Sequence, residues 1–202
     1  MSYARTRFWL ATGLSFAVWL AMVILGGGDW AVDQRYLARL SVYEDTAFAR
    51  NAALLTNLGG WQVLTGLTIA FAVGLAFKRK LRAALLLIIV FGGRLLVELQ
   101  KVMIDRARPG QSPYLEAVSS NSFPSGHAAN AMITYLAIAF LVPVRQRHRA
   151  IAMGLGFAAA LQIGWSRVAL GVHWPSDVIG GWAFGMLWIT ICIRMATDRP
   201  GE

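Results

Sequence analysis

The chain has 202 residues, of which 57% are hydrophobic and only 14% are charged. Soluble domains carry roughly 25% charged residues, so this composition excludes an ordinary soluble fold and indicates an integral membrane protein. The formal net charge of +9 does not favour nucleic-acid binding in so apolar a chain, because basic residues also border membrane spans and line anion pockets. The single cysteine, Cys192, excludes an internal disulfide. We expect one domain over residues 1–202.

Long apolar runs recur along the chain, each near the length that crosses about 30 Å of hydrocarbon as a helix. The sequence therefore predicts an all-α fold, an integral membrane bundle of six transmembrane helices. The expected spans are Phe8–Leu25, Trp61–Phe77, Ala83–Met103, Ala128–Val144, Ala150–Trp165 and Val178–Ile193. A secretory signal peptide is the alternative for the first run. Residues 26–30 are no clear cleavage site, however, so we expect a retained helix.

Two segments depart from this simple pattern. Arg94 and Glu98 fall inside the third span, four residues apart and therefore on one helix face. Charge at membrane depth is costly unless it is paired, so we expect these two side chains to pair with each other rather than to act directly. Residues 29–58 form the longest connection and show loose helical spacing of apolar residues. An interfacial helix and an ordinary covered loop both remain open there.

The basic residues indicate an orientation. Most Lys and Arg side chains lie before the first span, between spans two and three, between spans four and five, and after span six. By the positive-inside rule these segments face the cytoplasm. We therefore expect a multi-pass protein of the cell (inner) membrane with both termini cytoplasmic. The three polar segments described next would then lie on the periplasmic side.

The first polar segment follows the third span and contains Lys101, Arg108 and Pro109. Pro109 disfavours helix at the preceding residue, so Arg108 is expected to reach from a loop over the helix end. Arginine offers a planar fork of donors and lysine a point charge, and both suit a phosphate. Boundary residues that extend toward the membrane surface are the alternative interpretation.

The second segment, Pro124-Ser125-Gly126-His127, precedes an apolar run. Serine is a favoured N-cap, and glycine permits close approach of the backbone. The free N–H groups and the positive end of the helix dipole form an anion site at such a helix start. A plain N-cap beside an interfacial histidine is the alternative.

The third segment contains Arg167, His173 and Asp177, between the fifth and sixth spans. His173 and Asp177 are four residues apart and share a face if this turn is helical. An aspartate that accepts from one ring nitrogen fixes the tautomer and leaves the other nitrogen free to attack. A capping aspartate and an interfacial histidine are the alternative. Ionisable residues at membrane edges nevertheless favour a functional interpretation.

Together the three segments resemble the type 2 phosphatidic acid phosphatase superfamily, which also includes vanadium haloperoxidases and acid phosphatases. The family pattern is Lys, six residues, Arg-Pro; then Pro-Ser-Gly-His; then Ser-Arg, five residues, His, three residues, Asp. This sequence matches every fixed position between Lys101 and Asp177. Residues 101–177 therefore form the motif core, and the six-span pattern extends the resemblance over nearly the whole chain.

The resemblance implies roles for individual residues. His173 would be the nucleophile that forms a phosphohistidine, Asp177 would orient and charge-stabilise it, and His127 would protonate the leaving oxygen and then activate water. The residues implied to bind the phosphate are Lys101, Arg108, Ser125, Gly126 and Arg167. No metal and no other cofactor is implied, because Lys and Arg supply the positive charge. The sequence also lacks a carboxylate cluster suited to magnesium.

The implied activity is hydrolysis of a lipid phosphate whose tail stays in the bilayer. Phosphatidylglycerophosphate, phosphatidic acid and undecaprenyl pyrophosphate are the candidate substrates, with head-group selectivity expected in residues 110–121 and in helix-facing side chains. No nucleic acid and no obligate protein partner is expected. The alternatives are a lipid-phosphate flippase, a catalytically silent relative, and halide oxidation with vanadate in the same anion pocket.

Overall fold

The computed structural model describes residues 3–26, 31–41, 46–110 and 120–197. These residues form eight helices and no strand. The helices are α1 (Tyr3–Gly26), α2 (Ala31–Leu40), α3 (Ala47–Asn57), α4 (Trp61–Ala76), α5 (Lys80–Ile104), α6 (Gly126–Leu141), α7 (Gln146–Ala169) and α8 (Pro175–Thr197). The predicted all-α class is confirmed. Two predictions fall on residues outside those described: the absence of a cleavage site, on residues 27–30, and head-group selectivity, on residues 111–119.

Helices long and apolar enough to cross a membrane make this a multi-pass membrane protein. Within the described residues α1, α5, α7 and α8 meet that condition, and α3 with α4 add a fifth if the pair, bent by 41°, counts as one span. Each of the six predicted runs is a helix. However, α4 and α6 have only 16 residues each, a rise of about 24 Å, less than the roughly 30 Å of hydrocarbon.

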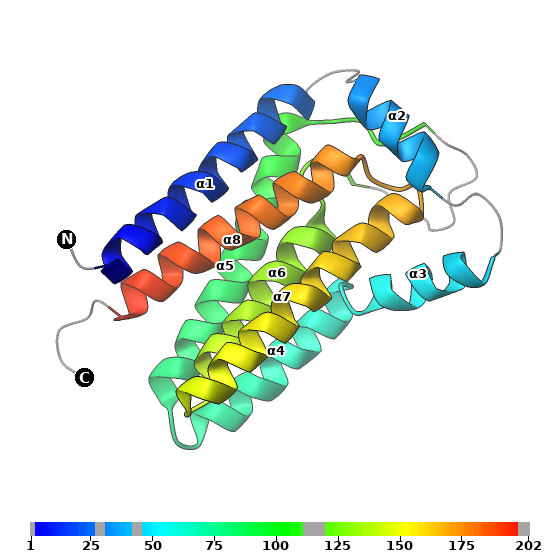
Figure 1. The fold of residues 1–202 in the computed structure, drawn as a ribbon. Coiled ribbons are helices and arrows are strands. Elements are labelled where there is room, and N and C mark those ends of the chain that lie inside the picture. The colour runs from blue at the N-terminus through cyan, green and yellow to red at the C-terminus, as the bar shows by residue number, and fades with distance from the viewer. Residues whose placement is uncertain (1–2, 27–30, 42–45, 111–119, 198–202) are drawn as a thin grey trace.

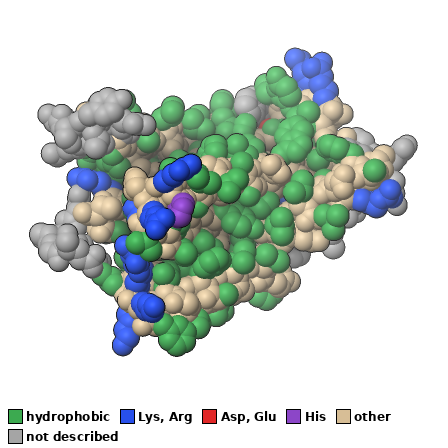
Figure 2. Space-filling view, turned by 60° about the horizontal axis from the view of Figure 1, so that its bottom comes forward, with side chains coloured by type: hydrophobic (Ala, Val, Ile, Leu, Met, Phe, Trp, Pro, Cys, Tyr) green, Lys and Arg blue, Asp and Glu red, His purple; other side chains and the backbone are tan. Residues whose placement is uncertain are grey.

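The helix bundle has two distinct ends (Figure 1). The start of α1 and the end of α8 lie toward one end, together with the α4–α5 and α6–α7 connections. Helices α2 and α3, the described residues between α5 and α6 (105–110 and 120–125), and the turn between α7 and α8 gather at the opposite end. Residues 29–58, left open between a loop and a helix, thus contain two helices. Hydrophobic side chains cover much of the surface between the ends (Figure 2), as lipid contact requires.

Helix α6 occupies the centre of the bundle and packs against α5, α7 and α8. It is rich in alanine, and its buried residues include Ala129, Met132 and Leu136. Small residues of α8 allow the close approach: a Cβ at Gly181 would lie 2.9 Å from the Ser125 carbonyl oxygen. Burial on all sides explains why a helix this short keeps its place in the bundle, and the packing fixes the start of α6 beside α8.

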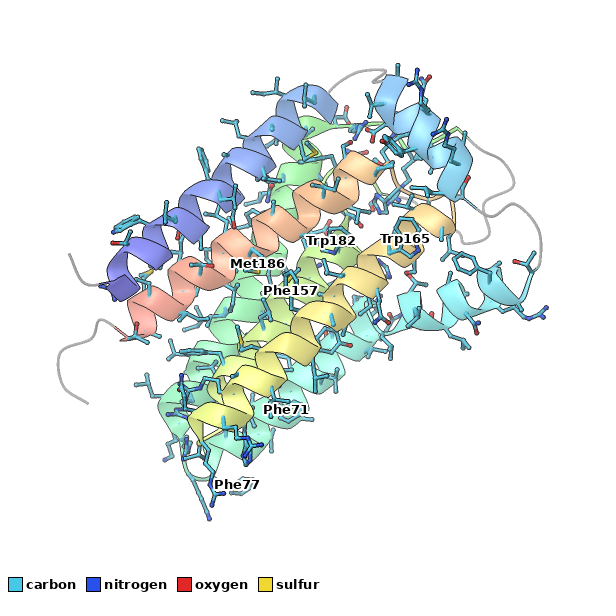
Figure 3. The ribbon with its side chains drawn as sticks, in the orientation of Figure 1. Phe71, Phe77, Phe157, Trp165, Trp182 and Met186 are labelled. Atoms are coloured by element: carbon cyan, nitrogen blue, oxygen red, sulfur yellow. The ribbon has the colours of Figure 1, made fainter. Side chains whose placement is uncertain are left out.

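A single tryptophan fills the space between α7 and α8. The indole of Trp182 in α8 points toward α7 (Figure 3) and donates from Nε1 to the Ala160 carbonyl oxygen at 3.0 Å. Gly164 of α7 lies against the same ring, where an added Cβ would be 2.4 Å from Nε1. Position 164 requires glycine because a side chain there would overlap the Trp182 ring, and not because of its backbone conformation.

We predict that Gly164→Ala lowers the stability of the bundle by about 1–3 kcal/mol, because the added methyl group overpacks the Trp182 contact. Thermal unfolding in detergent measures the change. Gly154→Ala is the matched control, because Gly154 lies in the same helix with nothing within 4 Å of an added Cβ. Equal unfolding temperatures for the two variants would contradict the prediction.

Candidate active site

One cavity of about 710 Å³ opens among α4, α5, α6 and α7 and extends to the turn before α8. Six of the eight residues that the sequence singled out line it: Lys101, Arg108, Gly126, His127, Arg167 and His173. The other two, Ser125 and Asp177, are fully buried beside it. Both histidines of the motifs therefore face one space, and three cations face the same space.

Lys101 reaches the cavity from the last turn of α5, and Arg108 reaches it from the loop that follows. Helix α5 ends at Ile104 because Asp105 takes a left-handed backbone conformation, with φ 49°, so Arg108 lies in the following loop as expected. The Lys101 ammonium donates to Ser120 Oγ at 3.1 Å. The Arg108 guanidinium donates to the Val172 carbonyl oxygen at 2.7 Å and lies 3.0 Å from His173 Nε2. Both cations are thus held in place by neighbouring polar atoms.

The start of α6 forms the floor between these cations. Ser125 is the N-cap, and its hydroxyl has no hydrogen-bond partner among the residues described. Its own N–H donates to the Asp177 carbonyl oxygen at 3.0 Å, which ties this turn to α8. A Cβ at Gly126 would lie 3.3 Å from Lys101 Nζ, so a side chain at this position would crowd the Lys101 ammonium. The N–H groups of the first turn stay available to an anion.

His173 is buried and is held by Asp177. The ring nitrogen Nδ1 lies 3.3 Å from Asp177 Oδ2, and the opposite nitrogen, Nε2, faces Arg108. The sequence argument required a helical turn across both residues, but α8 begins only at Pro175. Contact arises instead because the Trp174 N–H donates to Asp177 Oδ2 at 2.9 Å and folds the turn back over the helix start.

The electrostatic environment keeps the His173 imidazole neutral. Burial first, and then the positive charges of Arg108, Arg167 and Lys101, hold the pKa of His173 well below its ordinary value. The neutral ring carries one N–H, and Asp177 beside Nδ1 favours the tautomer with that proton on Nδ1. Nε2 then carries the unprotonated lone pair, which points toward Arg108, and an unprotonated ring nitrogen is what a nucleophile requires.

Arg167 and His127 complete the cavity wall. Arg167 is 1% exposed and donates to Thr56 Oγ1 at 2.8 Å, so the bent α3–α4 segment supports it. His127 lies one residue into α6. A Cβ at Gly59 would lie 2.3 Å from Ile163 Cγ2 and 3.1 Å from His127 Cδ2, so glycine at this position leaves room for both side chains.

Sequence reasoning missed a buried polar network behind His173. Arg106 donates to Asp33 Oδ2 at 2.7 Å and to Asp177 Oδ1 at 2.5 Å, and so bridges two carboxylates. Asp33 comes from α2 and also accepts from the Ser176 N–H at 2.9 Å and from the Ser176 hydroxyl. Ser122 donates to Asp177 Oδ2 at 2.5 Å. The only sequence signal was the position of Arg106 inside the first motif, since nothing local links it to Asp33.

The expected pairing of Arg94 with Glu98 is wrong. Glu98 Oε1 lies 3.6 Å from Lys101 Nζ, one turn further along α5. Arg94 donates to Thr65 Oγ1 at 3.5 Å and lies over the Trp61 ring, 5.6 Å from its centroid. Both charged side chains line the cavity, which offers them a polar environment at membrane depth.

The described residues contain no group of three His, Cys, Asp or Glu side chains that could hold a metal ion. Positive charge at the cavity comes from Lys101, Arg108 and Arg167, with Arg94 further along α5. Two arginines and a lysine around a helix start can surround the oxygens of a phosphate, and a neutral histidine stands beside them. The arrangement suits transfer of a phosphoryl group to a nitrogen atom.

Comparison with known proteins identifies the family. A model of the PAP2 superfamily matches residues 81–200, and the chain belongs to this superfamily, as the motifs predicted. Phosphatidylglycerophosphatase B of Bacillus subtilis is 38% identical over 138 residues, which cover 66% of this chain and 68% of that protein. Lipid A 1-phosphatase of Rhizobium johnstonii is 36% identical over 128 residues, 59% of this chain and 49% of that protein. The match thus spans about half the length of the Rhizobium protein.

A solved structure agrees with the fold. The crystal structure of a transmembrane PAP2-type phosphatidylglycerolphosphate phosphatase from Bacillus subtilis superposes with a TM-score of 0.85 at 27% identity. The superposition covers 95% of this chain and 98% of that one. The similarity therefore extends beyond the motif core to the helices that surround it.

We predict that Asp33→Ala destabilises the protein by about 3–5 kcal/mol, because it leaves one side of the buried Arg106 guanidinium without its carboxylate. Thermal unfolding in detergent measures the effect. Arg39→Gln changes an exposed charge on the same helix and should alter the unfolding temperature little. If Asp33→Ala unfolds at the same temperature as Arg39→Gln, the network does not stabilise the site end of the bundle.

Proposed function

We propose that this protein is a lipid phosphate phosphatase that works through a phosphohistidine intermediate and without a metal ion. One observation carries the proposal: two histidines and the three cations predicted to bind phosphate, from distant parts of the chain, line a single cavity at one end of a membrane helix bundle. A lipid phosphate fits this location, because its tail can stay between the helices and the bilayer while its head group enters the cavity. The family relatives support the same reaction class.

The first step transfers the phosphoryl group to the enzyme. Lys101, Arg108 and Arg167, with the Ser125 hydroxyl and the Gly126 N–H, bind the phosphate oxygens. His173 Nε2 attacks phosphorus, the P–N bond forms, and the P–O bond to the lipid breaks. Asp177 stabilises the charge that develops on the imidazole.

His127 donates a proton to the leaving lipid oxygen in that step. The bound phosphate is an anion beside this imidazole and favours its protonated form. In the second step the neutral His127 takes a proton from water, the water oxygen attacks phosphorus, and the P–N bond breaks. Inorganic phosphate leaves, and both histidines return to their starting protonation states.

We also propose a topology for the chain in the membrane. Residues 1–202 form one domain whose short helices α4 and α6 cross the bilayer inside the bundle, which gives six spans. The basic connections at one end favour the cytoplasmic side for both termini. The cavity then faces the periplasm, and the substrate is drawn from the outer leaflet of the inner membrane.

Candidate substrates are lipids with a terminal phosphate. Phosphatidylglycerophosphate and phosphatidic acid present a phosphomonoester, and undecaprenyl pyrophosphate presents a diphosphate. The name of the Bacillus relative favours phosphatidylglycerophosphate. Two observations argue against a flippase and against a catalytically silent relative. The relatives are named as phosphatases, and His127, His173 and the three predicted phosphate-binding cations line the cavity here.

We expect His173→Ala to reduce phosphate release from phosphatidylglycerophosphate by at least about a thousandfold, because the variant has no nucleophile. Phosphate release by purified protein in detergent is the measurement. His148→Ala serves as the matched control, since His148 is exposed in the first turn of α7 at the other end of the bundle. Full activity of His173→Ala would refute the proposed nucleophile.

Hydrolysis should also persist in a metal chelator. The proposed reaction draws its positive charge from Lys and Arg, so phosphate release in EDTA should match release in buffer with added magnesium within about twofold. Initial rates with and without chelator provide the measurement. Loss of activity in chelator, restored by a divalent cation, would require a different mechanism.

A further inference from the structure

The cavity is longer than a single phosphate requires. From the cations it continues along two helix faces that lie opposite each other. On α5 the lining side chains are Lys101, Glu98 and Arg94. On α6 they are His127, Asn130 and Thr134. In each set the first and last residues are seven positions apart, a helix rise of about 10.5 Å. Both sets run from the site end of the bundle toward its interior.

The inner part of this cavity is polar although it lies at membrane depth. Thr134 is fully buried, and its hydroxyl has no hydrogen-bond partner among the residues described. The side-chain oxygen of Asn130 is likewise unpaired within that part of the chain. Buried polar groups without partners are costly. Two of them that line one cavity indicate a polar ligand there.

Arg94 is a fourth cation that lines the cavity, two helical turns from Lys101 along α5. Its neighbours in the described residues are the Thr65 hydroxyl at 3.5 Å and the Trp61 ring, and neither carries a negative charge. Glu98 lies between Arg94 and Lys101, but it pairs with Lys101, and 52% of its side chain is exposed. The Arg94 charge therefore stays available to an anion inside the cavity.

We propose that Arg94, with Thr134 and Asn130, binds a second phosphate of the substrate on the tail side of the phosphate that is removed. This subsite rests on the proposed function, because it takes the reacting phosphate to be at Lys101, Arg108 and Arg167. The lipid tail extends from the reacting phosphate toward the bilayer interior. A second phosphate between the reacting phosphate and the tail therefore lies deeper in the bundle. Arg94 lies on that side.

The spacing selects between two kinds of substrate. In a diphosphate the two phosphates share one oxygen, so both stay near Lys101. In phosphatidylglycerophosphate a glycerol separates the terminal monoester from the phosphodiester, and two helical turns separate Lys101 from Arg94. The subsite therefore fits a glycerol-bridged phosphodiester, and it makes Arg94 a specificity-determining residue. Phosphatidic acid has no second phosphate to place there.

The test compares Arg94→Gln with the wild type on two lipids with the same acyl chains. For phosphatidylglycerophosphate, kcat/KM should fall by about 10- to 100-fold, the loss expected for a charge-assisted hydrogen bond. For phosphatidic acid it should change less than about threefold. Arg94→Lys should recover part of the loss. Arg147→Gln removes the same charge from the exposed first turn of α7 and should change neither rate.

Other results separate the subsite from the enzyme activity. Equal losses on both lipids, or no loss on phosphatidylglycerophosphate, would overturn the subsite and leave the phosphatase proposal intact. A wild type that releases phosphate from neither lipid would instead overturn the proposed function. Farnesyl diphosphate forms a third arm, on which Arg94→Gln should have little effect. A loss confined to farnesyl diphosphate would overturn the glycerol-bridged assignment.

Discussion

The site depends on one buried cation. The guanidinium of Arg106 lies between the carboxylates of Asp33 and Asp177 and is almost fully buried. A buried charge is tolerated only when its partners are in place, so these three residues must come together for this end of the bundle to form. They belong to α2, to the segment after α5, and to α8. One ion-pair network thus joins three parts of the chain directly behind His173.

This network also determines how Asp177 can act. Asp177 accepts from Arg106, from the Ser122 hydroxyl and from the Trp174 N–H, and it lies beside the His173 ring. A carboxylate with this many donors is fixed in position. The proposed nucleophile is therefore oriented by a rigid partner, whereas the cations lie on the other side of the ring and line the cavity.

The sequence predicted the cavity residues well because they are polar residues at the ends of apolar runs, where polarity needs a reason. The helical class followed from the same runs. Asp33 escaped notice because its partner, Arg106, is 73 residues away, and no local pattern pairs them. Glu98 was assigned to Arg94 by spacing alone, and the tertiary structure instead offers it Lys101. The lengths of α4 and α6 likewise depend on packing that periodicity does not reveal.

The contact between Gly164 and Trp182 links the hydrocarbon layer to the chemistry. Gly164 lies three residues before Arg167 on α7, and Trp182 lies five residues after Asp177 on α8. Their contact sets the spacing and the axial register of α7 and α8. It therefore sets the relative positions of Arg167 and of the Asp177 carboxylate behind His173. The geometry of a polar reaction is thus determined partly by an indole ring among lipid-facing helices. Substitutions far from any charge can therefore change turnover.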